Sequence, residues 1–162
     1  MSIRNMKSRF EFSPGTFYIG DLCYVMSPEW DEICGLTIEG NVCKEGVFTL
    51  ADGRTFGMWH TAYGDGTYTD NYGRENYCVD SGTIGIINIE DISDKESLAG
   101  ATERAVFKLG QVEVFDRPFE VYCRDGFFSF GRINIDTNYE EDQDEEYDYD
   151  AEDEDEYDSF RR

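Results

Sequence analysis

The sequence predicts a mainly β protein, a β-rich α+β fold in which a single antiparallel barrel- or sandwich-like domain carries one or two short helices. Short segments rich in β-branched and aromatic residues recur along the chain, as strands do in such domains. Asp-Gly steps at residues 52–53, 65–66 and 125–126 separate several of these segments and are typical of turns. A length of 162 residues suits one domain with a sizeable core and is short for two.

Composition divides the chain into three regions. Residues 1–12 form a polar N-terminal arm, which we expect to lie at an edge of the fold. Residues 13–138 hold the strand-like segments and form the β-rich domain. Residues 139–162 form an acidic tail, and because a dense run of like charges cannot collapse, we predict that this tail is disordered.

The first predicted strand of the domain covers residues 16–25 and contains a Gly20-Asp21 step between aromatic and β-branched residues. We interpret the step as a bulge or sharp bend within the strand, which would aim the Asp21 side chain at a specific place. A helix is expected next, because Ser27 is a favourable N-cap and Pro28 suits a first helical turn. The buried face of this helix would consist of residues spaced i, i+3 and i+4, which are Trp30, Ile33 and Cys34.

The middle of the chain alternates between apolar and polar residues. Residues 47–50 and 55–61 are predicted to form a hairpin, joined by a turn at Asp52-Gly53. Shorter strands are expected at residues 67–70 and 76–79, on either side of a Tyr-Gly step.

A continuous apolar run at residues 83–89 suits a strand buried on both faces and is the best candidate for the middle of a sheet. A second short helix is predicted at residues 92–102, where Ser93 and Glu96 have the spacing of a capping box. The remaining predicted strands cover residues 104–109, 112–115, 119–124, 127–130 and 132–135. Asp125-Gly126 predicts a type I′ hairpin turn, because this turn needs positive φ angles.

The net charge of −22 is concentrated towards the C-terminus. Residues 140–158 contain 14 acidic residues and no basic one, so residues 1–138 hold 36 − 14 = 22 acids. Two arginines close the chain, which leaves 14 − 2 = 12 bases and a net charge of −10 on residues 1–138. This charge disfavours direct binding to nucleic acid and to anionic membranes. It favours a basic partner, a metal or simply solubility, and a solubilising tail on an unrelated domain is an equally good explanation of the acidic segment.

The cysteines indicate an intracellular protein. Five is an odd number, no two cysteines have C-x-x-C spacing, and a single histidine accompanies them, so neither a zinc site nor a disulfide framework is predicted. The N-terminus has no apolar signal region, and no segment approaches the roughly 20 apolar residues of a membrane span. We therefore expect a cytoplasmic protein, located in the host cytoplasm if a bacteriophage encodes it.

Three aspartates next to turn residues are candidate ligands. Asp21, Asp65 and Asp80 would cluster at one end of the sheet if the predicted strands align, and carboxylate oxygens are the ligands that Mg²⁺ and Ca²⁺ prefer. The same side chains are also suited to bond the backbone of their own turns. We expect no cofactor, and a divalent metal bound by these aspartates is the alternative.

His60 is the only histidine and therefore the only candidate general base that titrates near neutral pH. In a hydrolase, Asp65 or Asp80 would orient His60, and Cys23 or Cys78 would be the nucleophile. A histidine beside Trp59 in an alternating strand is more often a half-buried packing residue. No catalytic residue is assigned, and His60 with Cys23 remains the alternative.

Tyrosines near the aspartates suggest a site for a planar ligand. Tyr63 and Tyr68 would stack on a nucleotide base, because a π face accepts any base. The alternative is that these tyrosines simply favour strands. The predicted ligand-binding residues are accordingly Asp21, Tyr63, Asp65, Tyr68 and Asp80. The basic residues nearby that would meet a phosphate are Arg54 and Arg74.

Three motifs follow one another between residues 16 and 90. They are G-D-L-C-Y-V at 20–25, T-A-Y-G-D-G-T-Y at 61–68 and D-S-G-T-I-G at 80–85. In order and spacing they resemble a family of small uncharacterised proteins of bacteriophages and bacteria, whose pattern is G-D-P-C-Y-V, T-A-Y-G-D-G-x-Y and D-x-G-x-I-G. Leu22 replaces the proline of that pattern, which affects the bend after Asp21. The resemblance implies a phage or bacterial origin and no particular activity.

The first functional hypothesis is a non-enzymatic acidic binding protein, encoded by a phage, that engages a basic partner such as a host nucleic-acid enzyme and imitates nucleic acid. The tail residues expected to contact this partner are Glu140, Glu141, Asp142, Asp144, Glu145, Glu146, Asp148 and Asp150. One alternative is a small-ligand, nucleotide or metal-binding protein, or a small hydrolase, with a site at Asp21, His60, Asp65 and Asp80. A second alternative is a structural component of a virion.

Overall fold

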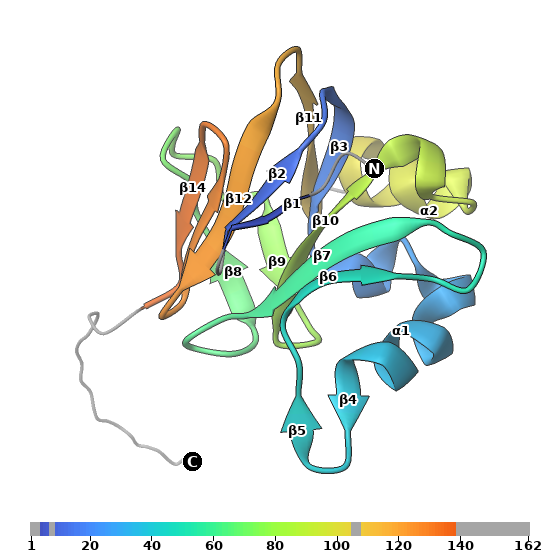
Figure 1. Cartoon of the computed structure of the whole chain (residues 1–162). Coiled ribbons are helices and arrows are strands. Elements are labelled where there is room, and N and C mark those ends of the chain that lie inside the picture. The colour runs from blue at the N-terminus through green and yellow to red at the C-terminus, as the bar shows by residue number, and fades with distance from the viewer. Residues whose placement is uncertain (1–3, 7–8, 105–107, 139–162) are drawn as a thin grey trace, which may run out of the picture.

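A computed structural model describes residues 4–6, 9–104 and 108–138. Two five-stranded antiparallel sheets face each other, and short helices cover the outer side of one of them (Figure 1). The predicted mainly β, sandwich-like domain is therefore confirmed. The predicted acidic tail lies outside the described residues.

The first sheet, sheet A, combines strands from both ends of the chain. Its order is β1 (Arg4–Met6), β2 (Arg9–Phe12), β12 (Phe119–Arg124), β13 (Phe127–Phe130) and β14 (Ile133–Asp136). Strands β12 and β13 form the predicted hairpin, with φ angles of 52° at Asp125 and 81° at Gly126. These positive angles are what a type I′ turn requires. The N-terminal residues 4–6 and 9–12 thus belong to a sheet, and β1 lies at its edge.

The second sheet, sheet B, has the order β11 (Gly110–Phe115), β3 (Gly15–Gly20), β10 (Thr83–Asn88), β7 (Thr55–His60) and β6 (Gly46–Thr49). The hairpin β6–β7 was predicted, and β10 lies at the centre of the sheet as its apolar sequence indicated. The remaining strands form two small hairpins outside these sheets. One consists of β4 (Ile38–Glu39) and β5 (Val42–Cys43), and the other of β8 (Gly66–Tyr68) and β9 (Tyr77–Val79).

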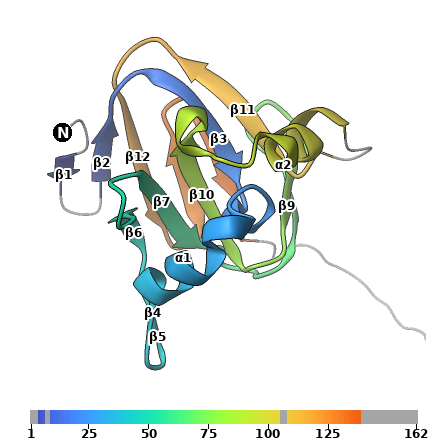
Figure 2. The same cartoon turned by 90° about the vertical axis from the view of Figure 1, so that its right-hand side faces the viewer.

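Two bent ribbons join the sheets at one corner. The chain passes from β2 in sheet A to β3 in sheet B, and from β11 in sheet B to β12 in sheet A. The two ribbons pair with each other on both sides of the corner, through Phe12 with Phe119 and Gly15 with Phe115 (Figure 2). Strands that switch sheets in this way give a sandwich one closed side, as in a barrel.

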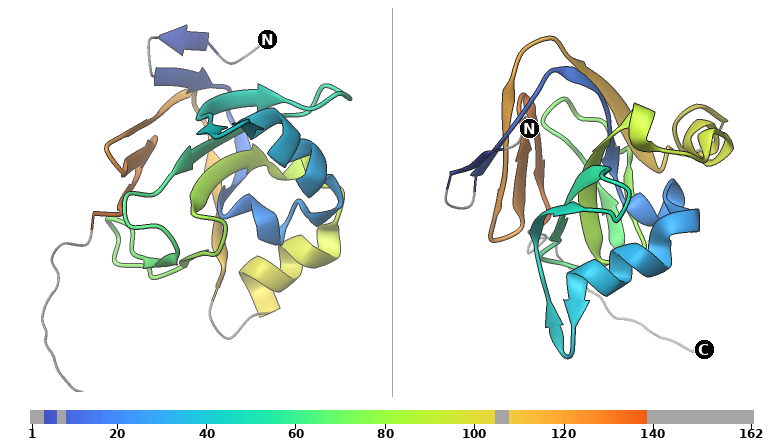
Figure 3. Two further views of the ribbon diagram at one scale, coloured as in Figure 1. Left: turned by 90° about the horizontal axis from the view of Figure 1, so that it is seen from below. Right: turned by 45° about the vertical axis from the view of Figure 1, so that its right-hand side comes forward.

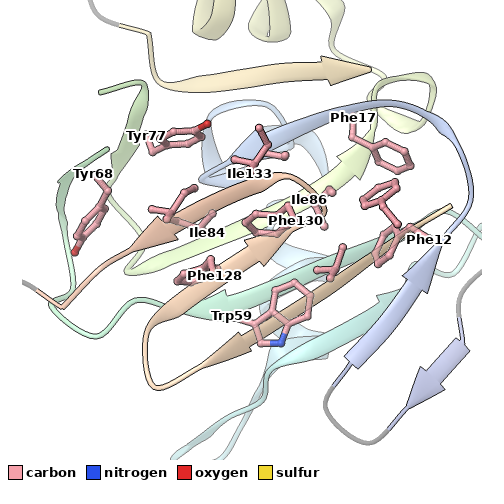
Figure 4. Packing of buried hydrophobic residues seen from close by; sticks show 14 of the residues in the cluster. Phe12, Phe17, Trp59, Tyr68, Tyr77, Ile84, Ile86, Phe128, Phe130 and Ile133 are labelled. Atoms are coloured by element: carbon pink, nitrogen blue, oxygen red, sulfur yellow. The ribbon is translucent and has the colours of Figure 1, made fainter. Parts of the chain in front are cut away.

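Sheet B is buried on both faces. Ile84 and Ile86 of β10 pack between the two sheets, with aromatic residues of sheet A (Figure 4). Ile87, on the opposite face, belongs to a second cluster beneath the helices. Because successive side chains of a strand point to opposite faces, a strand buried on both faces must be apolar throughout. The predicted double burial of this segment is confirmed.

The helical segments cover the face of sheet B that is turned away from sheet A (Figure 2). They are α1 (Trp30–Thr37), α2 (Lys95–Ala99), the 3-10 turns η1 (Leu22–Tyr24), η2 (Ser27–Glu29) and η3 (Ile89–Asp91), and the π-helical segment η4 (Gly100–Arg104). On α1, Ile33 is buried, while Trp30 and Cys34 of the predicted face are half-buried. Among the described residues, no helix has the length and apolarity needed to cross a membrane.

Four local predictions were wrong. Strand β3 ends at Gly20 instead of bending there, because Asp21 caps the 3-10 turn η1 through its side chain. Ser27 lies inside a 3-10 turn and does not cap α1. Asp94 replaces Ser93 as the N-cap of α2 and accepts a hydrogen bond from Ser97 N at 3.0 Å. Of the predicted strand 104–109, residue 104 is helical and residues 108 and 109 precede strand β11, while residues 105–107 lie outside the described part.

Candidate functional site

The buried carboxylate of Asp21 joins two loops at one end of sheet B. Its exposed fraction is 0%, and it accepts four hydrogen bonds. Cys23 N donates at 3.0 Å, Asp80 N and Ser81 N each donate at 2.7 Å, and Ser81 Oγ donates at 2.8 Å. A buried charge is tolerated only when hydrogen bonds satisfy it, so these four donors explain why an aspartate can occupy a fully buried position.

The other two predicted metal ligands lie at the same end but on the surface. Asp65 and Asp80 are exposed, and the charges of both, with that of Asp21, raise the pKa of the Cys23 thiol. The loops that carry the three aspartates therefore lie together at this end of sheet B. Donors from the protein itself occupy both oxygens of Asp21, and the described residues include no group of three or more His, Cys, Asp or Glu side chains arranged around a metal position. The divalent metal remains a prediction.

Cys23 is poorly suited to be a nucleophile. Burial raises the pKa of its thiol far above the usual value, and the charge and hydrogen bond of Asp21 raise it further. The reactive form of cysteine is the thiolate, so its reactivity at neutral pH is suppressed.

His60 ends strand β7 and pairs with a carboxylate that the sequence analysis did not identify. Its Nδ1 lies 3.0 Å from Glu45 Oε2, and its backbone N–H donates to the same oxygen at 2.8 Å. Gly46 is opposite Met58 in the β6–β7 hairpin, so the residue before Gly46 lies beside the end of β7. This register, which the sequence analysis did not predict, is what would have identified Glu45.

A cavity of about 240 Å³ lies next to His60, between sheet B, helix α1 and hairpin β4–β5. Its apolar walls include Trp30, Ile38 and Met58. Its polar lining includes His60, Ser81 and Thr83, the last of which is opposite His60 in the pairing of β10 with β7. The sequence does not predict this cavity, because helix α1 and hairpin β4–β5 come together with sheet B only in the tertiary structure.

The two predicted stacking tyrosines have different environments. Tyr68 is fully buried in the core between the sheets, and its hydroxyl donates to Gly64 O at 2.6 Å (Figure 4). Its ring face is therefore covered by the protein. Tyr63 is 63% exposed on the loop before β8.

The two arginines considered as phosphate ligands are held by carboxylates. Arg54 contacts Glu29 and Asp52, each at 2.8 Å. Arg74 contacts Asp70 at 2.8 Å and Glu113 at 2.7 Å. These ion pairs compete with any phosphate for the guanidinium groups, which weakens the case for a nucleotide.

Hydrogen bonds of Thr137 hold the last described residues against the loop after β7, at the end of the molecule where Asp65 lies. Its Oγ1 accepts a hydrogen bond from Ala62 N at 2.9 Å and donates to Gly126 O at 2.6 Å. Figure 3 (left), seen from below, shows the loop after β7 beside the end of β14. The predicted partner-binding residues, which begin at Glu140, lie outside the described residues, but the chain leaves the domain close to the loop that carries Asp65.

Comparison of the chain with protein-family models, with curated proteins and with solved structures found no match.

Proposed function

We propose that this protein is a non-enzymatic acidic binding protein that engages a basic protein partner, one that normally handles nucleic acid. The observation that carries the proposal is the position of the acidic residues. The segment with 14 acids, 140–158, follows closely on Thr137, which is hydrogen-bonded to the loop after β7. Exposed Asp65 lies on that loop, and exposed Asp80 lies on the neighbouring one.

The charge of the domain supports the proposal. Five of the described cationic side chains already form ion pairs with carboxylates, and these are Arg9, Lys44, Arg54, Arg74 and Arg132. With 22 acids and 12 bases in residues 1–138, the acidic excess is not balanced within the domain. Such a field attracts a basic surface and accelerates association.

Nucleic-acid mimicry is the form of binding that this charge favours. A protein that binds a phosphate backbone presents a basic groove, and a chain with closely spaced carboxylates competes for that groove. The resemblance to bacteriophage proteins adds a biological reason, since a phage benefits from occupying host nucleic-acid enzymes. On this proposal the protein acts in the host cytoplasm.

The proposal is tested by competition with DNA. A short fluorescent duplex is bound to a basic, sequence-independent DNA-binding protein, and the full chain is added while anisotropy is measured. We expect displacement of the duplex, weakened steeply between about 50 mM and 200 mM salt. A chain that lacks residues 139–158 should compete less and with a shallower salt dependence. The proposal is wrong if the full chain leaves the duplex bound at low salt, or if the deletion changes neither quantity.

The alternative, a small-ligand or metal site at Asp21, His60, Tyr63, Asp65 and Asp80, makes a different prediction. A ligand that binds only the folded state raises the melting temperature. The cavity beside His60 favours a bound ligand, but His60 is the only one of these five residues in its lining. Thermal unfolding with Mg²⁺, Ca²⁺ and a series of nucleotides, added separately, distinguishes this function from the first.

A further inference from the structure

We infer that the cavity beside His60 receives an arginine side chain from the basic partner, and this inference rests on the proposed function. The cavity measures about 240 Å³ and lies between helix α1, hairpin β4–β5 and the ends of β7 and β10. Pockets for drug-sized ligands are usually about 300–1,000 Å³. The size therefore suits one long side chain better than a nucleotide.

The two hydroxyl groups on the sheet side of the cavity, those of Ser81 and Thr83, offer acceptors and no free proton. Ser81 Oγ donates its only proton to the Asp21 carboxylate at 2.8 Å. Ser81 Oγ and Thr83 Oγ1 are 2.6 Å apart, so Thr83 must be the donor between them. Both hydroxyl protons are then used inside the protein, and the oxygen of Thr83 keeps lone pairs for a ligand.

His60 extends this pattern. Its Nδ1 faces Glu45 Oε2 at 3.0 Å, and a carboxylate only accepts hydrogen bonds. In the neutral imidazole, Nδ1 therefore carries the proton and Nε2 is an acceptor. Thr83 and His60 are directly opposite each other in β10 and β7, which places both side chains on the same face of sheet B.

The charge and the walls of the cavity select the ligand. Asp21 lies behind Ser81, and the carboxylate of Glu45 lies behind His60, so a cation is favoured at the polar lining. The opposite lining includes Trp30 and Ile38, which suits an aliphatic stem and a flat guanidinium. Arginine combines such a stem with several donors and no acceptor.

The surface next to the cavity indicates that this arginine is part of a protein segment and is not a free small molecule. Hairpin β4–β5 projects beyond both sheets (Figure 1) and exposes Ile38 by 48% and Val42 by 62%. Ile38 also lines the cavity. Apolar side chains beside an acceptor-lined cavity would contact the apolar residues that flank an arginine in a peptide segment, whereas a free small cation would leave them uncovered.

The test uses the full chain and a capped tripeptide with arginine between two leucines. Cys34 and Cys43 line the cavity, so bound peptide should slow their alkylation by iodoacetamide, followed by mass spectrometry. Cys78, which contacts Tyr24 and is not part of this lining, is the internal reference. A peptide with citrulline, the neutral isostere of arginine, should give no protection.

Two matched variants locate the contact. Thr83→Val should weaken peptide binding about tenfold, the effect of losing one hydrogen bond to a charged group. Thr55→Val makes the same change at the far end of β7 and should leave binding unchanged. If Thr83→Val does not fold, the comparison of arginine with citrulline on the natural chain decides the question.

The inference is overturned if citrulline and arginine peptides protect equally, or if Cys34 and Cys43 are no more protected than Cys78. Displacement of the duplex together with this result would leave the acidic binding function intact and remove only the arginine site. Protection by the arginine peptide without displacement of the duplex would instead reject the proposed function, while the preference of the cavity for arginine over citrulline would stand.

Discussion

Asp21 accepts two hydrogen bonds from Ser81, one from the backbone N–H at 2.7 Å and one from the hydroxyl at 2.8 Å. The two residues are 60 positions apart in the chain. This contact holds the loop after β3 against the loop before β10, and it orients the hydroxyl that begins the acceptor lining of the cavity. One buried carboxylate thus links the stability of the fold to the geometry of the candidate site.

Replacing Asp21 by asparagine should destabilise the protein by about 2–4 kcal/mol. The amide NH₂ group of asparagine takes the place of one carboxylate oxygen and then faces N–H or O–H donors instead of accepting from them. Urea unfolding at neutral pH measures this loss. Asp65→Asn, at an exposed position near the same loops, is the control and should change stability by less than about 0.5 kcal/mol. Similar stability of both variants would show that the Asp21 hydrogen bonds contribute little.

Asp70 should make the stability depend on acid pH. Burial alone would raise the pKa of this carboxyl, but hydrogen bonds from Tyr77, from backbone N–H groups and from Arg74 lower it overall. A lowered pKa in the folded state contributes stability above the unfolded value of about 3.9, and this stability is lost as the pH falls through the folded pKa.

The variant Asp70→Asn should therefore be less stable than the natural chain by about 1–3 kcal/mol at pH 7. The difference should shrink as the pH falls below about 4, because the carboxyl is protonated first in the unfolded chain, and it should vanish once the pH has passed through the lower pKa of the folded state. Chemical unfolding at a series of pH values measures it, and Asp116→Asn at an exposed turn is the control. A difference that stays constant into acid would contradict the assignment.

The cysteines should differ in their rates of alkylation. Burial raises the pKa of the Cys123 thiol to about 12, and burial with the charge of Asp21 raises the pKa of Cys23 well above its usual value. Cys43 is exposed. At pH 8, iodoacetamide should modify Cys43 first and Cys23 and Cys123 last, because the thiolate is the reactive form. In urea the rates should converge, and equal rates in the folded protein would rule out this environment for Cys23.

Two glycine substitutions should have opposite effects. A Cβ atom at Gly85 in β10 would lie 2.5 Å from the carbonyl oxygen of Gly57 and 2.8 Å from Leu22, so Gly85→Ala should cost about 1–3 kcal/mol. A Cβ atom at Gly35 in α1 meets no heavy atom within 4 Å, so Gly35→Ala should stabilise by about 0.5–1 kcal/mol. Thermal unfolding of both variants measures these changes. An unchanged melting temperature in Gly85→Ala would contradict the close packing of Gly85 against the neighbouring strand.

Local chemistry determined much of the fold. The hairpins at Asp52-Gly53 and Asp125-Gly126 were predictable because a turn and its flanking strands are close in sequence, and the turn residues supply the required φ angles. The double burial of residues 83–89 was equally visible, because only an apolar strand can lie between two packed layers.

Contacts distant in sequence decided the rest. Nothing local distinguishes an aspartate that binds a metal from one that accepts four hydrogen bonds, since three of the four donors belong to a loop about 60 positions away. The link between His60 and Glu45 needed the exact hairpin register, and the cavity needed α1 to pack over the sheet. The sequence by itself determined where the chain turns and which strands are buried, whereas the tertiary structure decided which polar groups satisfy one another, because burial forces each carboxylate to find donors on whatever segments the fold brings beside it.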